Sequence, residues 1–318
     1  MCKHEENNVE LQINIEKSPI PIVWLDTSII TTIAEFKFGY NLDKKASQRI
    51  VKLYTLISKL ADEGKILCPH AEQSEEVWCH RKDWLNAINE LSLGIETEAP
   101  QSIYLKQKKK FIQSFLNSEK AVSLSYRDAF LDDPINTLNE KLESQYFVYV
   151  DSKTVLGGSE KRKTVNNDIF RGWENLRMRN IKNNISFDRQ LERELQGELI
   201  DRDQQIDQWD QLRGKPEGLE GLVEFYKSNY YRSIPYIYLQ CTLTAHLLTR
   251  KEPIKSGDCM DIEHISTMLP YSNIFITDNP MKDLLLRRNL GVKYRTEVFS
   301  IKDIDDIIAS LLNITQTG

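Results

Sequence analysis

The sequence has few cysteines and no C-x-x-C pair. Its five cysteines are an odd number, which suits a reducing compartment and argues against a disulfide framework. A zinc site is one alternative, since its ligand types occur together in Cys68, His70, Cys79 and His80. The C-x-H and C-H spacing of these residues, however, differs from that of known zinc knuckles. We therefore favour a buried thiol and surface imidazoles at Cys68, His70, Cys79 and His80.

Long apolar runs and an excess of basic residues are also missing. No stretch reaches the ~18 apolar residues that a membrane span needs, and residues 1–11 lack the apolar segment of a secretory signal. The 42 Lys and Arg stand against 47 Asp and Glu, which excludes a nonspecific DNA coat but leaves a local basic groove open. We expect an ordered cytoplasmic protein.

A chain of 318 residues has room for two compact units, or for one core with a large insertion. Apolar runs at 20–25, 65–69 and 273–277 have the length of buried parallel strands, and segments of helical spacing separate them. A further edge strand is expected near 292–294. The long middle stretch is charged and favours helices. We therefore expect an α/β protein with a leader at residues 1–19, a core divided between residues 20–95 and 230–318, and a mostly α-helical insertion at residues 96–229.

Acidic residues follow the predicted strands. Asp26 and Asp278 each come directly after an apolar run, and Asp261 lies in the first turn of the helix that precedes the second run. In open parallel sheets the ligand crevice lies at the carboxyl ends of the strands. Three more acids, in the first turns after the run at 65–69, are expected to face the same crevice: Glu72, Glu75 and Glu76.

Such a cluster of carboxylates indicates a cation. At ~5 Å and an effective dielectric of ~20, two ionised carboxylates repel each other by roughly 3 kcal/mol, so a cation must neutralise them or some must stay protonated. Oxygen ligands without a matching His or Cys set select Mg²⁺ or Mn²⁺ over zinc. The chemistry that these ions support is hydrolysis of a phosphodiester.

These residues resemble the PIN-domain nucleases, especially the larger PIN-like branch with helical insertions. The resemblance covers about half of the chain, near 20–90 and 230–318. It rests on Val23-Trp-Leu-Asp-Thr-Ser28, on the passage from Pro69 to Glu76, and on Asp258 to His264 running into Phe275-Ile-Thr-Asp278. It implies a PIN-like parallel sheet sandwiched by helices. Carried over by position, the acids of the family fall on Asp26, on Glu75 or Glu76, on Asp261 and on Asp278.

The resemblance also implies an activity. PIN-like proteins are metal-dependent endonucleases that cut RNA and sometimes single-stranded DNA, and many bacterial members are toxins or defence effectors. We expect Mg²⁺ or Mn²⁺ bound by the four positions Asp26, Glu76, Asp261 and Asp278, a nucleic-acid substrate with RNA more frequent than DNA, a homodimer, and an inhibitor or regulatory partner.

For other residues near the acids, two interpretations of their role are possible. Thr27, Ser28 and Thr277 either orient the carboxylates or only cap strand ends. Asp258 is an N-cap or supports the metal ligands, with Glu72 as a further supporting acid. His264 contacts phosphate or assists proton transfer, or it is a structural histidine.

Two basic runs lie in the expected insertion. In a net-acidic chain they are candidate contacts to a polyanion, or else solvated helix faces, and the nearby aromatic residues Tyr104, Tyr126, Phe170 and Trp173 either stack bases or form the core of the helical block. The candidate nucleic-acid contacts are Lys106, Lys108, Lys109, Lys110, Lys161, Arg162 and Lys163.

Two other functions compete with the nuclease. A haloacid-type phosphatase also begins with an Asp after a strand, but this chain has Ser28 where that family requires a second Asp. A non-catalytic PIN-like scaffold would bind RNA or protein without cutting, although all four acidic positions are filled here.

Overall fold

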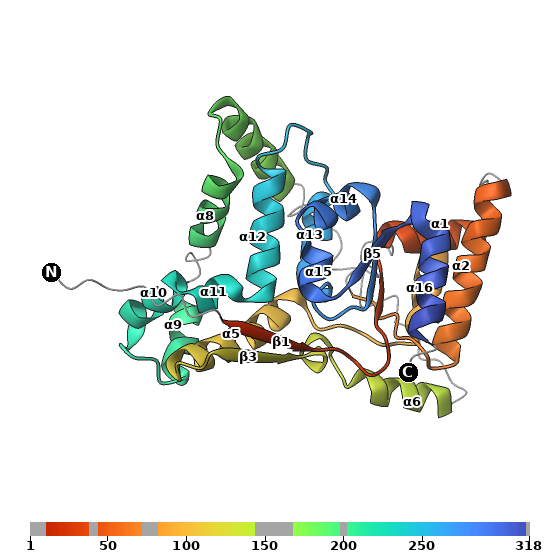
Figure 1. Cartoon of the computed structure of the whole chain (residues 1–318), viewed down its shortest axis with the longest axis horizontal. Coiled ribbons are helices and arrows are strands. Elements are labelled where there is room, and N and C mark those ends of the chain that lie inside the picture. Colours follow the sequence, from red (N-terminus) through yellow and green to blue (C-terminus); the bar gives the residue numbers. More distant parts are fainter. Residues whose placement is uncertain (1–10, 38–43, 72–81, 144–167, 198–201, 316–318) are drawn as a thin grey trace.

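The centre of the protein is a parallel sheet. The computed structural model describes residues 11–37, 44–71, 82–143, 168–197 and 202–315 (Figure 1). Its three strands pair in the order β2-β4-β5, with Leu25 opposite Ile276 and Thr277 opposite Ser300. The strands β2 and β4 are fully buried, which explains why they appear in the sequence as continuous apolar runs. The edge strand β5 is only partly buried. The strands are β2 (Val23–Leu25), β4 (Ile274–Thr277) and β5 (Glu297–Ser300).

Two further segments extend this sheet beyond β2. The amide of Val23 donates to the carbonyl of Leu67 at 2.8 Å, and the amide of His70 donates to the carbonyl of Ile95 at 3.0 Å. Both contacts belong to parallel bridges. Across the sheet, the segments therefore lie in the order 95–97, 67–70, β2, β4, β5. If they are numbered by their order along the chain, this is 3-2-1-4-5. This is a doubly wound arrangement whose winding direction reverses between β2 and β4.

The segment at 65–69 forms isolated bridges and no continuous strand, contrary to the sequence prediction. Pro69 has no amide hydrogen to donate, which interrupts a ladder at that point. The segment still occupies the place of a strand in the sheet.

Helices cover the sheet on two sides. In Figure 1, α1, α2 and α16 lie on one side of β5, and α12, α13 and α15 on the other. On the first side α2 contacts α1 and α16, and on the second α13 packs on α12 and α5. The predicted α/β class is therefore confirmed. The helices named here are α1 (Thr27–Lys37), α2 (Lys44–Asp62), α5 (Pro100–Leu116), α12 (Pro235–Leu247), α13 (Asp258–Met268), α15 (Leu290–Tyr294) and α16 (Ile304–Ile314).

A second, two-stranded parallel sheet lies beneath the first in Figure 1. It pairs β1 (Gln12–Glu16) with β3 (Ala121–Ser125). The guanidinium of Arg295 donates to the carbonyl of Ile15 at 2.7 Å, and the ammonium of Lys17 donates to the carbonyl of Ser272 at 2.5 Å. Because these partners precede β5 and β4, β1 lies at the amino ends of those strands. The expected leader thus contains a strand.

The rest of the described middle section is helical. Part of it touches the core, since α5 packs on α13 and β3 pairs with β1. Its other elements are α4 (Lys82–Ser92), α6 (Pro134–Glu143), a helix over 168–182, α8 (Phe187–Gly197), α9 (Arg202–Gln211), α10 (Gly218–Lys227) and α11 (Asn229–Ser233). No described helix is long and apolar enough to span a membrane.

The predicted edge strand near 292–294 is wrong, because this segment is the short helix α15. Leu290 and Tyr294 are buried while Val292 is 79% exposed. This four-residue spacing of buried positions belongs to a helix. The edge strand is β5, which follows α14 (Asn279–Arg287) and α15.

Candidate functional site

Asp26 and Asp278 lie at the same edge of the sheet. Asp26 follows β2 and Asp278 follows β4, and these neighbouring strands run parallel. The amide of Asp26 donates to the carbonyl of Ile276 at 3.0 Å. The winding reverses between these two strands, and in doubly wound sheets a ligand crevice forms at that point beyond the carboxyl ends. The two acids therefore lie at the edge where sheets of this kind bind their ligands.

The carboxylate of Asp26 is buried and fixed by several donors. Only 4% of the residue is exposed. Its Oδ1 accepts from the amide of Thr27 at 2.8 Å, and its Oδ2 accepts from the hydroxyls of Ser28 at 3.2 Å and Thr277 at 3.4 Å. The three polar neighbours proposed from the sequence thus all contact this carboxylate. Such contacts fix the direction in which it can present its remaining lone pairs.

Asp278 has a structural task as well. It is the N-cap of α14, where its Oδ1 accepts from the amide of Met281 at 2.8 Å. Among the described residues no hydrogen bond to its Oδ2 is assigned. One carboxylate oxygen therefore stabilises the start of a helix, and the other is available at the sheet edge.

The third acid of the prediction, Asp261, lies in the first turn of α13. The ring of His264 on this helix lies 5.6 Å from the ring of Trp24 in β2, so α13 crosses that strand. Asp261 precedes His264 by three residues, which is ~4.5 Å along a helix, in the direction of the sheet edge. His264 itself is 3% exposed and belongs to the packing between helix and sheet.

The amino end of α13 is acidic. Burial, and then the carboxylates of Asp258, Asp261 and Glu263, raise the pKa of the Cys259 thiol to about 12. Burial alone has the same effect on Cys68, whose pKa is raised to about 12.

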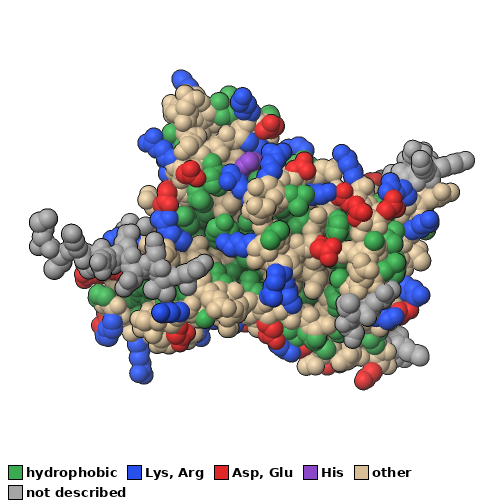
Figure 2. Space-filling view, viewed as in Figure 1, with side chains coloured by type: hydrophobic (Ala, Val, Ile, Leu, Met, Phe, Trp, Pro, Cys, Tyr) green, Lys and Arg blue, Asp and Glu red, His purple; other side chains and the backbone are tan. Residues whose placement is uncertain are grey.

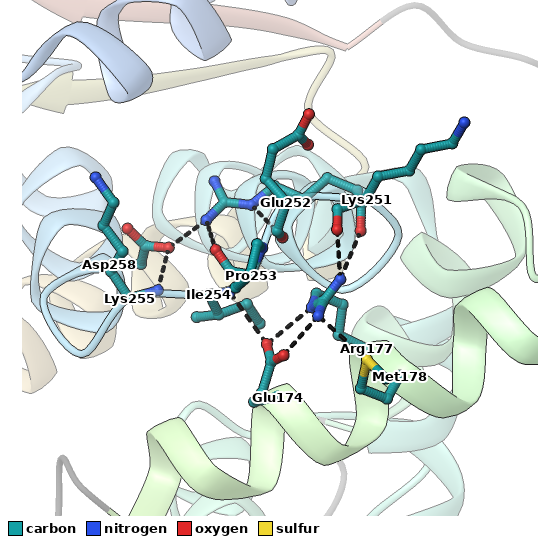
Figure 3. Close-up of polar contacts among 10 residues, drawn as sticks. Glu174, Arg177, Met178, Lys251, Glu252, Pro253, Ile254, Lys255 and Asp258 are labelled. Atoms are coloured by element: carbon teal, nitrogen blue, oxygen red, sulfur yellow. Dashed lines mark hydrogen bonds and ion pairs between the residues drawn. The ribbon is translucent and has the colours of Figure 1, made fainter.

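Asp258 is held in an ion pair with the loop before α13 (Figure 3). Its Oδ2 lies 2.5 Å from a guanidinium nitrogen of Arg250 and accepts from the amide of Lys255 at 2.9 Å. The N-cap of α13 is Gly257, so the predicted capping role is wrong. Asp258 instead ties the loop between α12 and α13 to the first turn of α13.

Several predicted residues lie outside the described part of the chain. They include all three glutamates proposed for the site and two members of the zinc alternative: Glu72, Glu75, Glu76, Cys79 and His80. The remaining zinc candidates, Cys68 and His70, are both buried. The predicted buried thiol is thus confirmed at Cys68, but the predicted surface imidazole at His70 is wrong, because His70 lies in the sheet, bridged to Glu96.

An acid on the third strand of the sheet was not predicted from the sequence. Asp303 follows β5, where it accepts from the amide and hydroxyl of Ser300 at 2.8 and 2.7 Å and pairs with Lys282 of α14 at 2.7 Å. Burial acts to raise the pKa of Asp303, but hydrogen bonds from Lys282 and Ser300 outweigh it and lower the pKa. The S-x-x-D spacing from Ser300 to Asp303 is typical of a capping box, and this pattern could have identified Asp303 in the sequence.

The basic run on α5 does not form a solvated stripe. Lys108 is fully buried, with its ammonium 5.6 Å from the ring of Tyr104 and 5.3 Å from the ring of Tyr226, which removes it from any nucleic-acid surface. Lys106 pairs with Glu98 at 2.8 Å and Lys110 pairs with Asp128. Lys109 is the exposed member of the run.

The second run lies outside the described residues, as Lys161, Arg162 and Lys163. The four aromatic residues proposed to stack bases divide by burial: Tyr104 and Tyr126 are buried, while Phe170 and Trp173 are half-buried and pack against the core. Figure 2 shows basic and acidic side chains mixed over the visible face, as the balanced composition requires.

Among the described residues, no three His, Cys, Asp or Glu side chains are grouped closely enough to hold a metal ion. The donors at the sheet edge are carboxylate and hydroxyl oxygens, which are the ligand types of Mg²⁺ and Mn²⁺. No family model, curated protein or solved structure matches this chain.

Proposed function

We propose that this protein is a Mg²⁺- or Mn²⁺-dependent endonuclease with a PIN-like core, acting on RNA or single-stranded DNA. The observation that carries the proposal is the position of Asp26, a buried carboxylate at the point where the winding of the sheet reverses, beside Asp278 on the next strand. Burying a carboxylate is costly unless donors or a cation compensate for it. A residue kept there at that cost is a candidate for function.

The side chains have separate tasks in this proposal. Asp26 and Asp278 bind the divalent ion, Asp261 and a glutamate from 72–76 complete its ligands, and Ser28 and Thr277 hold Asp26 in one orientation. When bound, the ion supplies an activated water and stabilises charge on the oxygens of the phosphodiester. Lys282, already paired with Asp303 at this edge, is placed to offset the negative charge of the crevice.

The test is cleavage of labelled single-stranded RNA and DNA with Mn²⁺. We expect cleavage that EDTA abolishes, and a loss of at least about 100-fold in Asp26→Asn and Asp278→Asn, the range seen when metal-site residues are removed. Asp278→Asn is informative because Asn caps a helix about as well as Asp, so the variant loses the charge and keeps the cap. Asp283→Asn, an exposed carboxylate on the same helix, is the matched control and should cleave normally.

The other outcomes decide against the proposal. Binding of the strand without cleavage under any metal would favour the non-catalytic scaffold. Release of phosphate from a small phosphoester, with an aspartyl adduct at Asp26, would favour the haloacid-type phosphatase. An equal loss of cleavage in Asp283→Asn would mean that the loss in the site variants comes from the change in net charge.

A further inference from the structure

Two surface grooves lie along β3, one at its end and one at its start. The first, of about 580 Å³, is lined by β1, by β3 and by residues 293–295. The second, of about 800 Å³, is lined by the end of α5, by the start of β3 and by residues 212–215. Lys110 and Ser123 line both grooves. The two grooves therefore adjoin at these residues, and together they are here called the β3 channel.

The lining of the β3 channel is predominantly cationic. Its basic residues come from three separate parts of the chain, and its acidic residues are Glu16 and Glu119. Glu16 accepts from the hydroxyl of Ser125 at 2.6 Å and Glu119 accepts from the hydroxyl of Ser114 at 2.8 Å. Two of the cations are paired as well, Lys110 with Asp128 and Lys215 with Glu217, but the basic side chains of the lining still outnumber the acidic ones. The basic residues are Lys110, Arg213, Lys215, Lys293 and Arg295.

Two of these cations are fixed at the rim. The guanidinium of Arg295 donates to the carbonyl of Ile15 at 2.7 Å, and the ammonium of Lys293 lies 3.2 Å from the centre of the Tyr238 ring. Burial, and then the charge of Arg295, lower the pKa of nearby Lys17 to about 7. Burial is the larger cause, and the charge of Arg295 adds to it, so this cation lies close enough to act on a neighbouring amine.

At the other end, Arg213 and Lys215 are exposed. Lys215 pairs with Glu217, and Arg213 forms no ion pair among the residues that the structure describes. The cations are spread along the channel and do not converge on one point. Such spacing suits a chain of phosphates and does not suit a single small anion.

We propose that the β3 channel binds a single nucleic-acid strand through its phosphates, as a second binding surface apart from the carboxylates of the sheet edge. The nature of the ligand rests on the proposed nuclease function. The channel lies at the amino ends of β4 and β5, where Arg295 and Lys17 attach β1, whereas Asp26 and Asp278 lie at the carboxyl ends. It therefore holds a long substrate and takes no part in cleavage.

The lining also determines whether the channel can distinguish one base sequence from another. Its aromatic residue, Tyr294, is 4% exposed, so among the described lining residues no open ring is offered to stack on a base. Contacts to phosphate position a strand without reading its sequence. The channel is thus expected to tolerate any base sequence.

The experiment measures binding of a fluorescently labelled oligouridylate by anisotropy in EDTA, where no cleavage occurs. We expect Lys293→Gln/Arg295→Gln and Arg213→Gln/Lys215→Gln each to weaken binding about tenfold. Each pair should also reduce the salt slope by about 1.4, which is about 0.7 for each phosphate of a single strand that the variant no longer neutralises. The matched control, Lys52→Gln/Lys59→Gln, removes two exposed cations of α2 and should bind as the wild type does.

Two further measurements separate this proposal from the nuclease. Asp26→Asn should bind the oligouridylate normally, and the channel variants should cleave a dinucleotide as fast as the wild type while their KM for long RNA rises. Wild-type affinity in both channel variants, or an equal loss in the α2 control, would overturn the channel. Because Arg295 also anchors β1, the pair Arg213→Gln/Lys215→Gln provides the decisive variant if the other one unfolds.

Discussion

At the scale of single residues, the proposed metal site depends on the hydroxyls that contact Asp26. Ser28 and Thr277 come from different parts of the chain, and both donate to the same carboxylate oxygen. Two donors on one oxygen restrict the orientation of the carboxylate. This arrangement suits a metal ligand, which must be preorganised without being neutralised.

Removing these hydroxyls should weaken the metal site without abolishing it. We expect Thr277→Val, which keeps the side-chain shape, to lower Mn²⁺ affinity and cleavage by about 10- to 100-fold. Isothermal titration with Mn²⁺ measures the affinity, and the thermal midpoint reports folding. Thr315→Val is the control, because its hydroxyl only contacts backbone carbonyls at the end of α16, such as that of Leu311. A variant with unchanged Mn²⁺ affinity would show that Thr277 is only a strand-end residue.

Glu174 provides a pH-dependent contact in the helical section. It accepts from the guanidinium of Arg177 at 2.8 and 2.5 Å and from the amide of Ile254 at 3.0 Å (Figure 3). The hydrogen bonds from Arg177, together with that amide, lower the pKa of Glu174 to about 2 despite some burial. The contact therefore links the helix over 168–182 to the loop before α13.

The stability supplied by Glu174 should disappear in acid. A depressed pKa stabilises the fold at pH values above the ordinary pKa of glutamate, and this contribution is lost as the pH falls toward 2. We expect Glu174→Gln to lower the free energy of unfolding by about 1–2 kcal/mol at neutral pH and by less at about pH 3. Urea unfolding at both pH values measures this. Glu224→Gln, whose partner Lys227 is exposed, should change little, and a difference for Glu174→Gln that does not depend on pH would contradict the assignment.

At the scale of elements, α13 is positioned by the ion pair of its first residue. The side chains of Asp258 and Arg250 are 5% and 14% exposed. Breaking a buried pair leaves an uncompensated charge, which costs about 3–5 kcal/mol. This pair fixes the loop that precedes α13. The helix α13 carries Asp261 and is followed along the chain by β4.

We therefore expect Asp258→Asn to destabilise the protein by about 3 kcal/mol and to leave Mn²⁺ affinity unchanged below the unfolding temperature. Urea unfolding and titration with Mn²⁺ measure the two effects. Asp305→Asn is the control, since its pair with Arg49 is exposed and is worth about 1 kcal/mol or less. A stable Asp258→Asn variant that loses cleavage would instead place Asp258 in the reacting site.

The elements that the sequence predicted well are those with strong local patterns. The strand before Asp26 and the strand before Asp278 follow from apolar runs that end in polar residues. The short helix α15 was mistaken for a strand because five residues contain too little of a period to distinguish the two. The strand β1 was missed because most of its residues are not buried and its partner β3 lies far away in the sequence.

At the scale of the whole molecule, the sequence could place acids at strand ends but could not say which distant segments meet. The sheet-edge position of Asp26 and Asp278 follows from the general rule for parallel sheets. The β3 channel could not be predicted, because Lys110, Arg213 and Arg295 come together only through the docking of β1 at the amino ends of β4 and β5. The predicted basic run contributed only Lys110 to that channel.

The central claim is that the carboxylates at the carboxyl end of the sheet bind a divalent cation. Its most direct test is the anomalous scattering of Mn²⁺ in crystals of the full chain soaked in that ion. We expect a peak in contact with the carboxylates of Asp26 and Asp278, and its disappearance in Asp26→Asn. Well-occupied Mn²⁺ bound elsewhere, with none between these two residues, would contradict the claim.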